Sequence, residues 1–227
     1  MASSRSAQLL PAGSGASLAT VIRRAGRCGA VFAALAVLAM RTEDGWVSRI
    51  DQRTISALPH GRHPAGIAMA KAVSALAERE FVFALLAAQA IPQARRDGWR
   101  AACAPGLAVV SGAMARRMLS QVIARPRPPA AVWLTEPEGF SLPSKHTTLA
   151  ALAAGALADA TSTTGMRRSA AIFFAAAAAG TSRVYLGVHW PSDVLAAWLF
   201  AEGWLSLTGV AHERGTGGQS GTSATSR

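Results

Sequence analysis

The sequence predicts an all-α protein, a bundle of about six membrane-spanning helices that forms one domain over residues 17–212. Three observations lead to this prediction. Apolar residues make up 51% of the 227 residues, they gather in separate runs, and arginines cluster between those runs in an alternating pattern. A chain of this length fits one domain, or two at most. Residues 1–16 and 213–227 are rich in small and polar residues, and we expect both to be unstructured tails.

Six apolar runs define the expected helices. They cover residues 28–40, 81–91, 101–118, 147–160, 169–180 and 194–210, and an amphipathic stretch over 64–78 extends the second run upstream. Several runs are shorter than the roughly 20 residues of a spanning helix, so they must gain length from their flanks. A buried Ala-rich bundle outside a membrane is the alternative. The first run resembles a signal-peptide core, but no convincing cleavage site follows it, which favours an uncleaved anchor.

The arginine clusters favour the membrane. In a six-helix serpentine, four basic clusters fall at the same end: Arg23 with Arg24 and Arg27, Arg95 with Arg96 and Arg100, Arg167 with Arg168, and Arg214. The positive-inside rule places that end in the cytoplasm. The bias is incomplete, because four arginines between residues 41 and 62 fall at the other end. We expect a multi-pass protein of the cell membrane.

The net charge narrows the choice of partner. A formal charge of +11 suits nucleic acid, anionic lipid or a phosphorylated substrate. Aromatic residues make up only 6% of the chain and no nucleic-acid-binding motif is present, so we expect no nucleic acid. The lipid bilayer and a phosphorylated substrate remain as the expected partners.

Three polar stretches lie at the end opposite the basic clusters. They are SQVIARPRPP (120–129), SLPSKHTT (141–148) and SRVYLGVHWPSD (182–193). The first two bound the connection between the third and fourth runs, and the third bounds the connection between the fifth and sixth. The serpentine therefore brings all three to one extracytoplasmic surface, where charged side chains usually mark a functional site.

The cations and donors in these stretches suit a phosphorylated substrate. Arg125, Arg127 and Arg183 are permanent cations whose guanidinium forks match phosphate oxygens. Ser144 and the backbone amides at the start of the following helix can add neutral donors. The three stretches thus contain the groups of a phosphate-binding site.

Two histidines supply groups that can react. Asp193 follows His189 by four residues, so on a helix its carboxylate lies beside the imidazole, fixes the tautomer and leaves the other nitrogen free. His146 is the second histidine. Together with the arginines, and without metal-ligand spacing, they suggest phosphoryl transfer through a phosphohistidine: one histidine attacks phosphorus and the other protonates the departing oxygen. We expect neither a metal nor another cofactor.

The spacing of these residues resembles that of the type 2 phosphatidic acid phosphatase (PAP2) superfamily, whose helical core is shared with vanadium haloperoxidases. The resemblance covers about residues 28–210. The matching residues, from the first motif to the third, are Arg127–Pro128, then Pro143–Ser144 with His146, then Ser182–Arg183 with His189 and Asp193. The resemblance implies that His189 is the nucleophile, Asp193 its orienting partner and His146 the general acid. It also implies metal-independent phosphate binding by Arg127, Arg183 and Ser144.

Two positions depart from the family pattern. The first motif of the family has Lys where this chain has Ser120, and the second usually has Gly where this chain has Lys145. We interpret the two departures as linked, with Lys145 returning the lost cation. Arg117, one helical turn before Ser120, is the other candidate. Phosphatase activity that survives Lys145→Gly but not Arg117→Ala would reject Lys145. Arg117 and Lys145 therefore join Arg125 among the further candidate phosphate-binding residues.

The resemblance implies hydrolysis of a lipid-linked phosphate monoester or diphosphate whose tail stays in the bilayer. An extracytoplasmic site suits polyprenyl phosphates of a bacterial envelope pathway. The Ala/Arg-rich composition is similar to that of actinobacterial members and suggests decaprenyl-linked cell-wall intermediates. Four alternatives remain: a phospholipid phosphatase acting on phosphatidic acid or phosphatidylglycerol phosphate, a lipid phosphotransferase, a vanadate-dependent haloperoxidase, and a non-catalytic lipid-phosphate binding protein. Fold alone does not fix the substrate, and the sequence does not give the oligomeric state.

Overall fold

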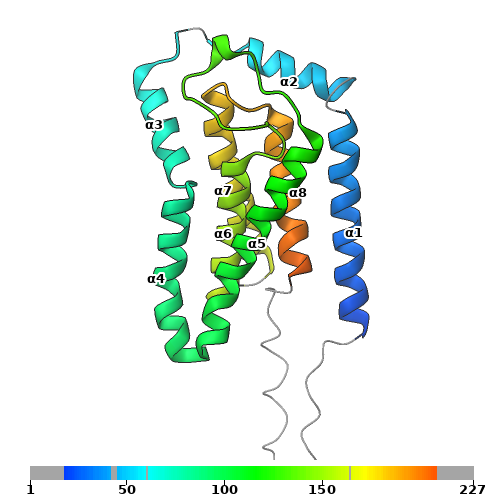
Figure 1. Ribbon diagram of the computed structural model, residues 1–227, viewed down its shortest axis with the longest axis vertical. Coiled ribbons are helices and arrows are strands. Elements are labelled where there is room, and N and C mark those ends of the chain that lie inside the picture. Colours follow the sequence, from blue (N-terminus) through cyan, green and yellow to red (C-terminus); the bar gives the residue numbers. More distant parts are fainter. Residues whose placement is uncertain (1–17, 42–44, 60, 164, 209–227) are drawn as a thin grey trace, which may run out of the picture.

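The protein is entirely helical over the residues that the computed structural model describes, which are 18–41, 45–59, 61–163 and 165–208. These ranges contain eight α-helices and one 3-10 helix (Figure 1). In chain order they are α1 (Leu18–Arg41), α2 (Trp46–Ser56), α3 (Pro64–Ala75), α4 (Arg79–Asp97), α5 (Trp99–Ile123), η1 (Ala130–Val132), α6 (Lys145–Ala160), α7 (Gly165–Tyr185) and α8 (Pro191–Leu207). The all-α prediction is confirmed. The two expected tails lie outside the described residues.

Five of the six apolar runs fall within one of the longer helices α1, α4, α5, α6 and α7, and α8 contains the sixth as far as Leu207. Polar flanks lengthen these helices, as the short runs required. Among the described helices, none combines the length and mean hydropathy needed to cross a membrane.

The sequence prediction was wrong about the chain between the first two long helices. Residues 64–78 do not extend α4, because α3 ends at Ala75 and Glu78 has an extended backbone (φ −74°, ψ 150°) that starts a new helix. The sequence also gave no indication of α2. This helix buries Val47, Asp51 and Ile55, which are spaced four residues apart and so share one face.

α6 is the central helix of the bundle. Twelve of its 16 residues are buried, and it packs against α4, α5, α7 and α8. Small side chains allow this close approach: a Cβ added at Gly155 would collide with Leu205 of α8 and with Ile172 of α7. A core built of Ala and Gly brings helix backbones near one another, so small shifts in side-chain volume are felt directly.

The long helices run alternately up and down, so the bundle has two distinct ends (Figure 1). The start of α1, the α4–α5 turn and the end of α8 lie at one end. The helix α2, the start of α3 and the loop over 124–144 lie at the other, together with the α7–α8 turn. The three polar stretches therefore meet at one end of the bundle, as the serpentine predicts, and Arg95 and Arg96 lie at the opposite end.

Candidate active site

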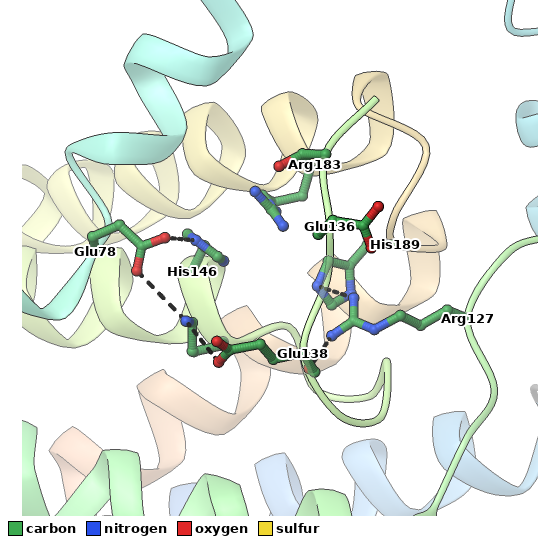
Figure 2. A pocket seen from close by; sticks show the side chains of 9 residues that line it. Glu78, Arg127, Glu136, Glu138, His146, Arg183 and His189 are labelled. Carbon is green, nitrogen blue, oxygen red and sulfur yellow. Dashed lines mark hydrogen bonds and ion pairs between the residues drawn. The ribbon is translucent and has the colours of Figure 1, made fainter. Parts of the chain in front are cut away.

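The three polar stretches enclose a pocket of about 110 Å³ at that end (Figure 2). Arginines, histidines and carboxylates from separate parts of the chain face one another across it. Its lining residues are Glu78, Arg127, Thr135, Glu136, Glu138, Lys145, His146, Arg183 and His189. Five of the nine residues predicted for the site line this pocket: Arg127, Lys145, His146, Arg183 and His189.

The turn between α7 and α8 positions His189. Leu186 and Val188 are fully buried and anchor the turn on both sides of Gly187. Gly187 has a φ of +76°, and a Cβ there would collide with the carbonyl oxygen of Val132, so only glycine fits. Pro191 then begins α8, where its missing N–H costs no helical hydrogen bond.

The contacts of His189 define its tautomer. Its Nδ1 lies 3.2 Å from Asp193 Oδ2, and its Nε2 lies 3.0 Å from Arg127 Nη1. A guanidinium can only donate hydrogen bonds, so Nε2 accepts and the ring proton sits on Nδ1, where it is donated to Asp193. The lone pair of a potential nucleophile is thus on Nε2, beside a cation. The predicted pairing of His189 with Asp193 is present.

Burial keeps the His189 imidazole neutral. Desolvation lowers the pKa of His189 to about 4, although the hydrogen bond and charge of Asp193 act to raise it, and Arg127 lowers it further. The ring is therefore uncharged at neutral pH. Burial also lowers the pKa of Arg127 to about 10, so this guanidinium remains a cation at neutral pH.

Asp193 is held by a buried network behind the pocket. Its carboxylate accepts hydrogen bonds from Arg125 Nη1 at 2.5 Å and from the backbone N–H of Trp190 at 2.9 Å. Arg125 also binds Asp51 of α2 at 2.7 Å. The sequence predicts that Arg125 binds phosphate, but the structure places it elsewhere. Its side chain is 8% exposed, it is paired with two carboxylates, and it does not line the pocket.

Arg127 fastens the loop over residues 138–140 to the site. Its guanidinium donates to the carbonyl oxygens of Glu138, Gly139 and Phe140 at distances of 2.7 to 3.1 Å. It also donates to the carbonyl oxygen of Val188 at 2.7 Å. The same side chain therefore supplies positive charge at His189 Nε2 and fixes the wall of the pocket.

His146 lies in the first turn of α6, across the pocket from His189. Its Nε2 is 2.6 Å from Glu78 Oε1, and Lys145 Nζ is 3.5 Å from the other oxygen of Glu78. Figure 2 shows that Glu78 approaches the ring from the side away from His189. The Nδ1 of His146 is buried and has no hydrogen-bond partner in the described part of the chain, so it can donate to a ligand oxygen when the ring is doubly protonated.

Arg183 and Ser144 occupy different positions relative to the pocket. Arg183 lines it and donates from Nη1 to Ser74 Oγ at 2.8 Å. Ser144 is fully buried as the N-cap residue of α6, where its hydroxyl accepts from Thr147 at 3.1 Å. Ser144 therefore does not reach the pocket, contrary to its expected contact with phosphate.

Lys145 and Arg117, the two residues that could supply the cation lost at Ser120, differ in position. Lys145 lines the pocket, whereas Arg117 lines a neighbouring cavity of about 190 Å³ that also contains Ser120 and Lys145. Lys145 is therefore the only one of the two that reaches the pocket containing both histidines. Within the described ranges, no group of three or more His, Cys, Asp or Glu side chains is arranged to hold a metal ion.

Sequence reasoning missed two acids that matter to the site. Glu78 is not singled out in the sequence, because residues 64–78 are predicted as an extension of the second apolar run. Its place immediately before that run, at the same end as the polar stretches, was the available signal. Asp51 could have been noticed from the spacing of Val47 and Ile55 around it, which marks a buried face. The acids of the loop, Glu136 and Glu138, had no pattern to reveal them.

Comparison with known proteins agrees with this site. The chain matches the model of the PAP2 superfamily over residues 101–214, half of its length. The chain thus belongs to the PAP2 superfamily. Its fold is similar to the crystal structure of the first transmembrane PAP2 type phosphatidylglycerolphosphate phosphatase from Bacillus subtilis. The TM-score is 0.67 at 24% identity, with 81% of this chain and 94% of that chain covered. No curated protein matches the sequence.

Proposed function

We propose that this protein hydrolyses a lipid-linked phosphate, of the polyprenyl phosphate or diphosphate type, through a phosphohistidine at His189. One observation carries the proposal: the unprotonated Nε2 of His189 faces the pocket beside Arg127, while Asp193 holds the opposite ring nitrogen. Groups that can serve as nucleophile, orienting carboxylate and cation for the transferred phosphoryl group thus lie together, which supports the proposal.

In the first step, His189 Nε2 attacks phosphorus and the bond from phosphorus to the leaving oxygen breaks. The leaving oxygen keeps the electron pair and takes a proton from Nδ1 of His146, which enters this step as an imidazolium. Arg127 and Arg183 stabilise the charge on the other phosphoryl oxygens. Asp193 stabilises the imidazolium that forms on His189, since its carboxylate already accepts the Nδ1 proton.

In the second step, water attacks the phosphohistidine. His146, now unprotonated, accepts a proton from that water, the phosphorus–nitrogen bond breaks and inorganic phosphate leaves. Glu78 orients the His146 ring and acts to stabilise its protonated form through the 2.6 Å contact at Nε2, against burial and the charge of Arg183, which lower the pKa of His146 to about 4. No step in this sequence requires a metal ion.

The surface of the bundle supports a lipid substrate at a membrane. Large apolar side chains are exposed along α5, among them Leu107, Met114, Met118 and Val122. Such a surface beside a phosphate-binding pocket suits a substrate whose head group is polar and whose tail is not. The proposed orientation has the basic turns in the cytoplasm and the pocket at the extracytoplasmic face. A decaprenyl-linked cell-wall intermediate and an actinobacterial source remain predictions from composition.

A phosphate-release assay tests the proposal. The detergent-purified protein is offered polyprenyl phosphates, phosphatidic acid and phosphatidylglycerol phosphate, with and without chelator, and His189→Ala is the control. We expect the highest release from the polyprenyl substrates, no effect of chelator and no activity in the variant. Faster release from a phospholipid would assign that lipid as the substrate in place of a polyprenyl phosphate. Activity that survives His189→Ala or disappears with chelator would reject the mechanism.

Three other activities are separated by related measurements. Transfer of the phosphoryl group to an added alcohol would identify a phosphotransferase. Vanadate-dependent oxidation of bromide would identify a haloperoxidase. Tight retention of lipid phosphates with no turnover on any of them would identify a binding protein.

A further inference from the structure

A second cavity lies beside the active-site pocket. Its volume is about 190 Å³, larger than the 110 Å³ of the pocket itself. Its lining residues are Arg116, Arg117, Ser120, Gln121, Glu138, Gly139, Phe140 and Lys145. Glu138 and Lys145 line both cavities, so the two spaces are neighbours separated by these side chains.

The second cavity carries an excess of positive charge. Three of its lining residues are cations, Arg116, Arg117 and Lys145, and one is an acid, Glu138. The acid is a weak partner, because its side chain is 91% exposed and its oxygen is 3.9 Å from Lys145. Arg116 donates to a backbone oxygen, that of Pro143, at 3.0 Å. In the described part of the chain no ion pair involves Arg116 or Arg117, so their charge is available to a ligand.

Ser120, the residue that stands where the family pattern has a lysine, lines this second cavity. Ser120 is 4% exposed and lines the space with a short hydroxyl side chain. A long side chain at this position would occupy the volume that serine leaves. Arg117, three residues earlier on α5, lines the same space as Ser120, as residues three apart on a helix do. The chain therefore has an open cationic cavity where the family pattern has a lysine.

We propose that this cavity binds the second phosphoryl group of a diphosphate head group, which makes the protein selective for lipid diphosphates over monophosphates. The inference rests on the proposed function. The terminal phosphoryl group lies at His189, and the phosphoryl group attached to the lipid lies between Arg116 and Arg117. Lys145, which lines both cavities, lies near the bridging oxygen.

This arrangement assigns the products. His189 Nε2 forms a bond to the terminal phosphorus, and the bond from that phosphorus to the bridging oxygen breaks. The bridging oxygen leaves with the electron pair as part of a lipid monophosphate, whose added negative charge Arg116, Arg117 and Lys145 stabilise. Water then releases the terminal group as inorganic phosphate. One diphosphate and one water thus yield one lipid monophosphate and one phosphate.

The test compares farnesyl diphosphate with farnesyl monophosphate, which have the same tail and differ by one phosphoryl group. The readout is the ratio of their kcat/KM values for the full chain in detergent. Arg117→Ala should lower this ratio at least about tenfold, the factor expected for the loss of one charge-assisted hydrogen bond. Arg117→Lys, which keeps the charge, should lower it less. Arg96→Ala, which removes an exposed arginine at the opposite end of the bundle, is the matched control and should leave the ratio unchanged.

A binding measurement with His189→Ala separates this inference from the proposed function. Pyrophosphate should bind more tightly than orthophosphate, and Arg117→Ala added to that variant should remove the difference. An unchanged ratio of the kcat/KM values in Arg117→Ala, whether or not both values fall, would overturn the second subsite. Equal binding of pyrophosphate and orthophosphate would overturn it as well. Wild-type protein that releases no phosphate would reject the proposed function instead, and the binding comparison would still decide the inference.

Discussion

The two histidines of the site are held in different ways. The carboxylate beside His189 belongs to Asp193, which is 0% exposed and is itself fixed by Arg125 and a backbone N–H. The carboxylate beside His146 belongs to Glu78, which is 40% exposed and shared with Lys145. The difference indicates that the protein fixes its nucleophile within a fully buried network, whereas the buried proton-transfer group, His146, is paired with a carboxylate that solvent reaches.

The largest expected effect concerns the rigid side of this comparison. Asp193→Asn keeps the shape of the carboxylate but presents an amide to His189 Nδ1, which favours the wrong tautomer. We expect kcat to fall about 10³- to 10⁴-fold, as in other sites where a buried carboxylate orients a catalytic imidazole. Phosphate release measures the effect, with thermal unfolding as a control for folding. A loss below about tenfold would show that Asp193 does not orient the nucleophile.

The second effect is on stability. Arg125→Met leaves the carboxylates of Asp51 and Asp193 buried without their cation. The free energy of unfolding should fall by about 3–5 kcal/mol, the usual cost of breaking a buried ion pair. Denaturant unfolding in detergent measures it. The matched change on the other side, Lys145→Met, removes a half-exposed cation and should cost under about 1 kcal/mol. Equal costs for the two variants would remove the distinction between a buried and an exposed network.

The third effect is the pH dependence of stability. The pKa of His189 is about 4 in the folded protein, below its ordinary value of 6.5. The unfolded chain therefore binds a proton between pH 6.5 and 4 that the folded protein does not, and stability falls as the pH is lowered through this window. From pH 7 to 5 the contribution is about 2 kcal/mol. His189→Gln should lose this part of the slope. A slope identical in wild type and variant would contradict the buried, neutral imidazole.

The smallest effect concerns Glu78. Glu78→Gln keeps a hydrogen-bonding group at His146 but removes the charge that stabilises its protonated form. We expect about a tenfold fall in kcat for a lipid phosphate, whose alkoxide leaving group needs a proton, and a smaller fall for 4-nitrophenyl phosphate. The difference between the two substrates is the diagnostic, because a purely structural defect lowers both equally. Equal losses would place Glu78 outside the proton transfer.

The sequence predicted those parts of the molecule that depend on local spacing. The apolar runs located the six long helices, and the four-residue interval from His189 to Asp193 placed both groups on one helical turn. Contacts between distant segments were not predictable in this way. Asp51 meets Arg125 across 74 residues of sequence, and Glu78 meets His146 across 68. No local sequence pattern predicts that α2 and the start of α4 lie at the same end of the bundle.

The roles of the arginines illustrate the same limit. Arg125 and Arg127 are two residues apart, and both are candidate phosphate ligands as permanent cations, although only Arg127 matches the PAP2 motif. The fold turns Arg125 into the buried network and Arg127 into the pocket, which their spacing does not predict, because residues two apart in a regular extended chain face the same side. Only the tertiary structure separates a residue that contacts substrate from one that positions Asp193.

The central claim, that His189 is the nucleophile, is tested most directly by trapping the intermediate. Purified protein is mixed with a polyprenyl phosphate labelled with ³²P in its terminal phosphoryl group, quenched within milliseconds in base, and digested for peptide mapping. We predict an acid-labile, base-stable label on the peptide that contains His189, and no label in His189→Ala. A label on another residue, or a variant that still forms a labelled protein, would contradict this account.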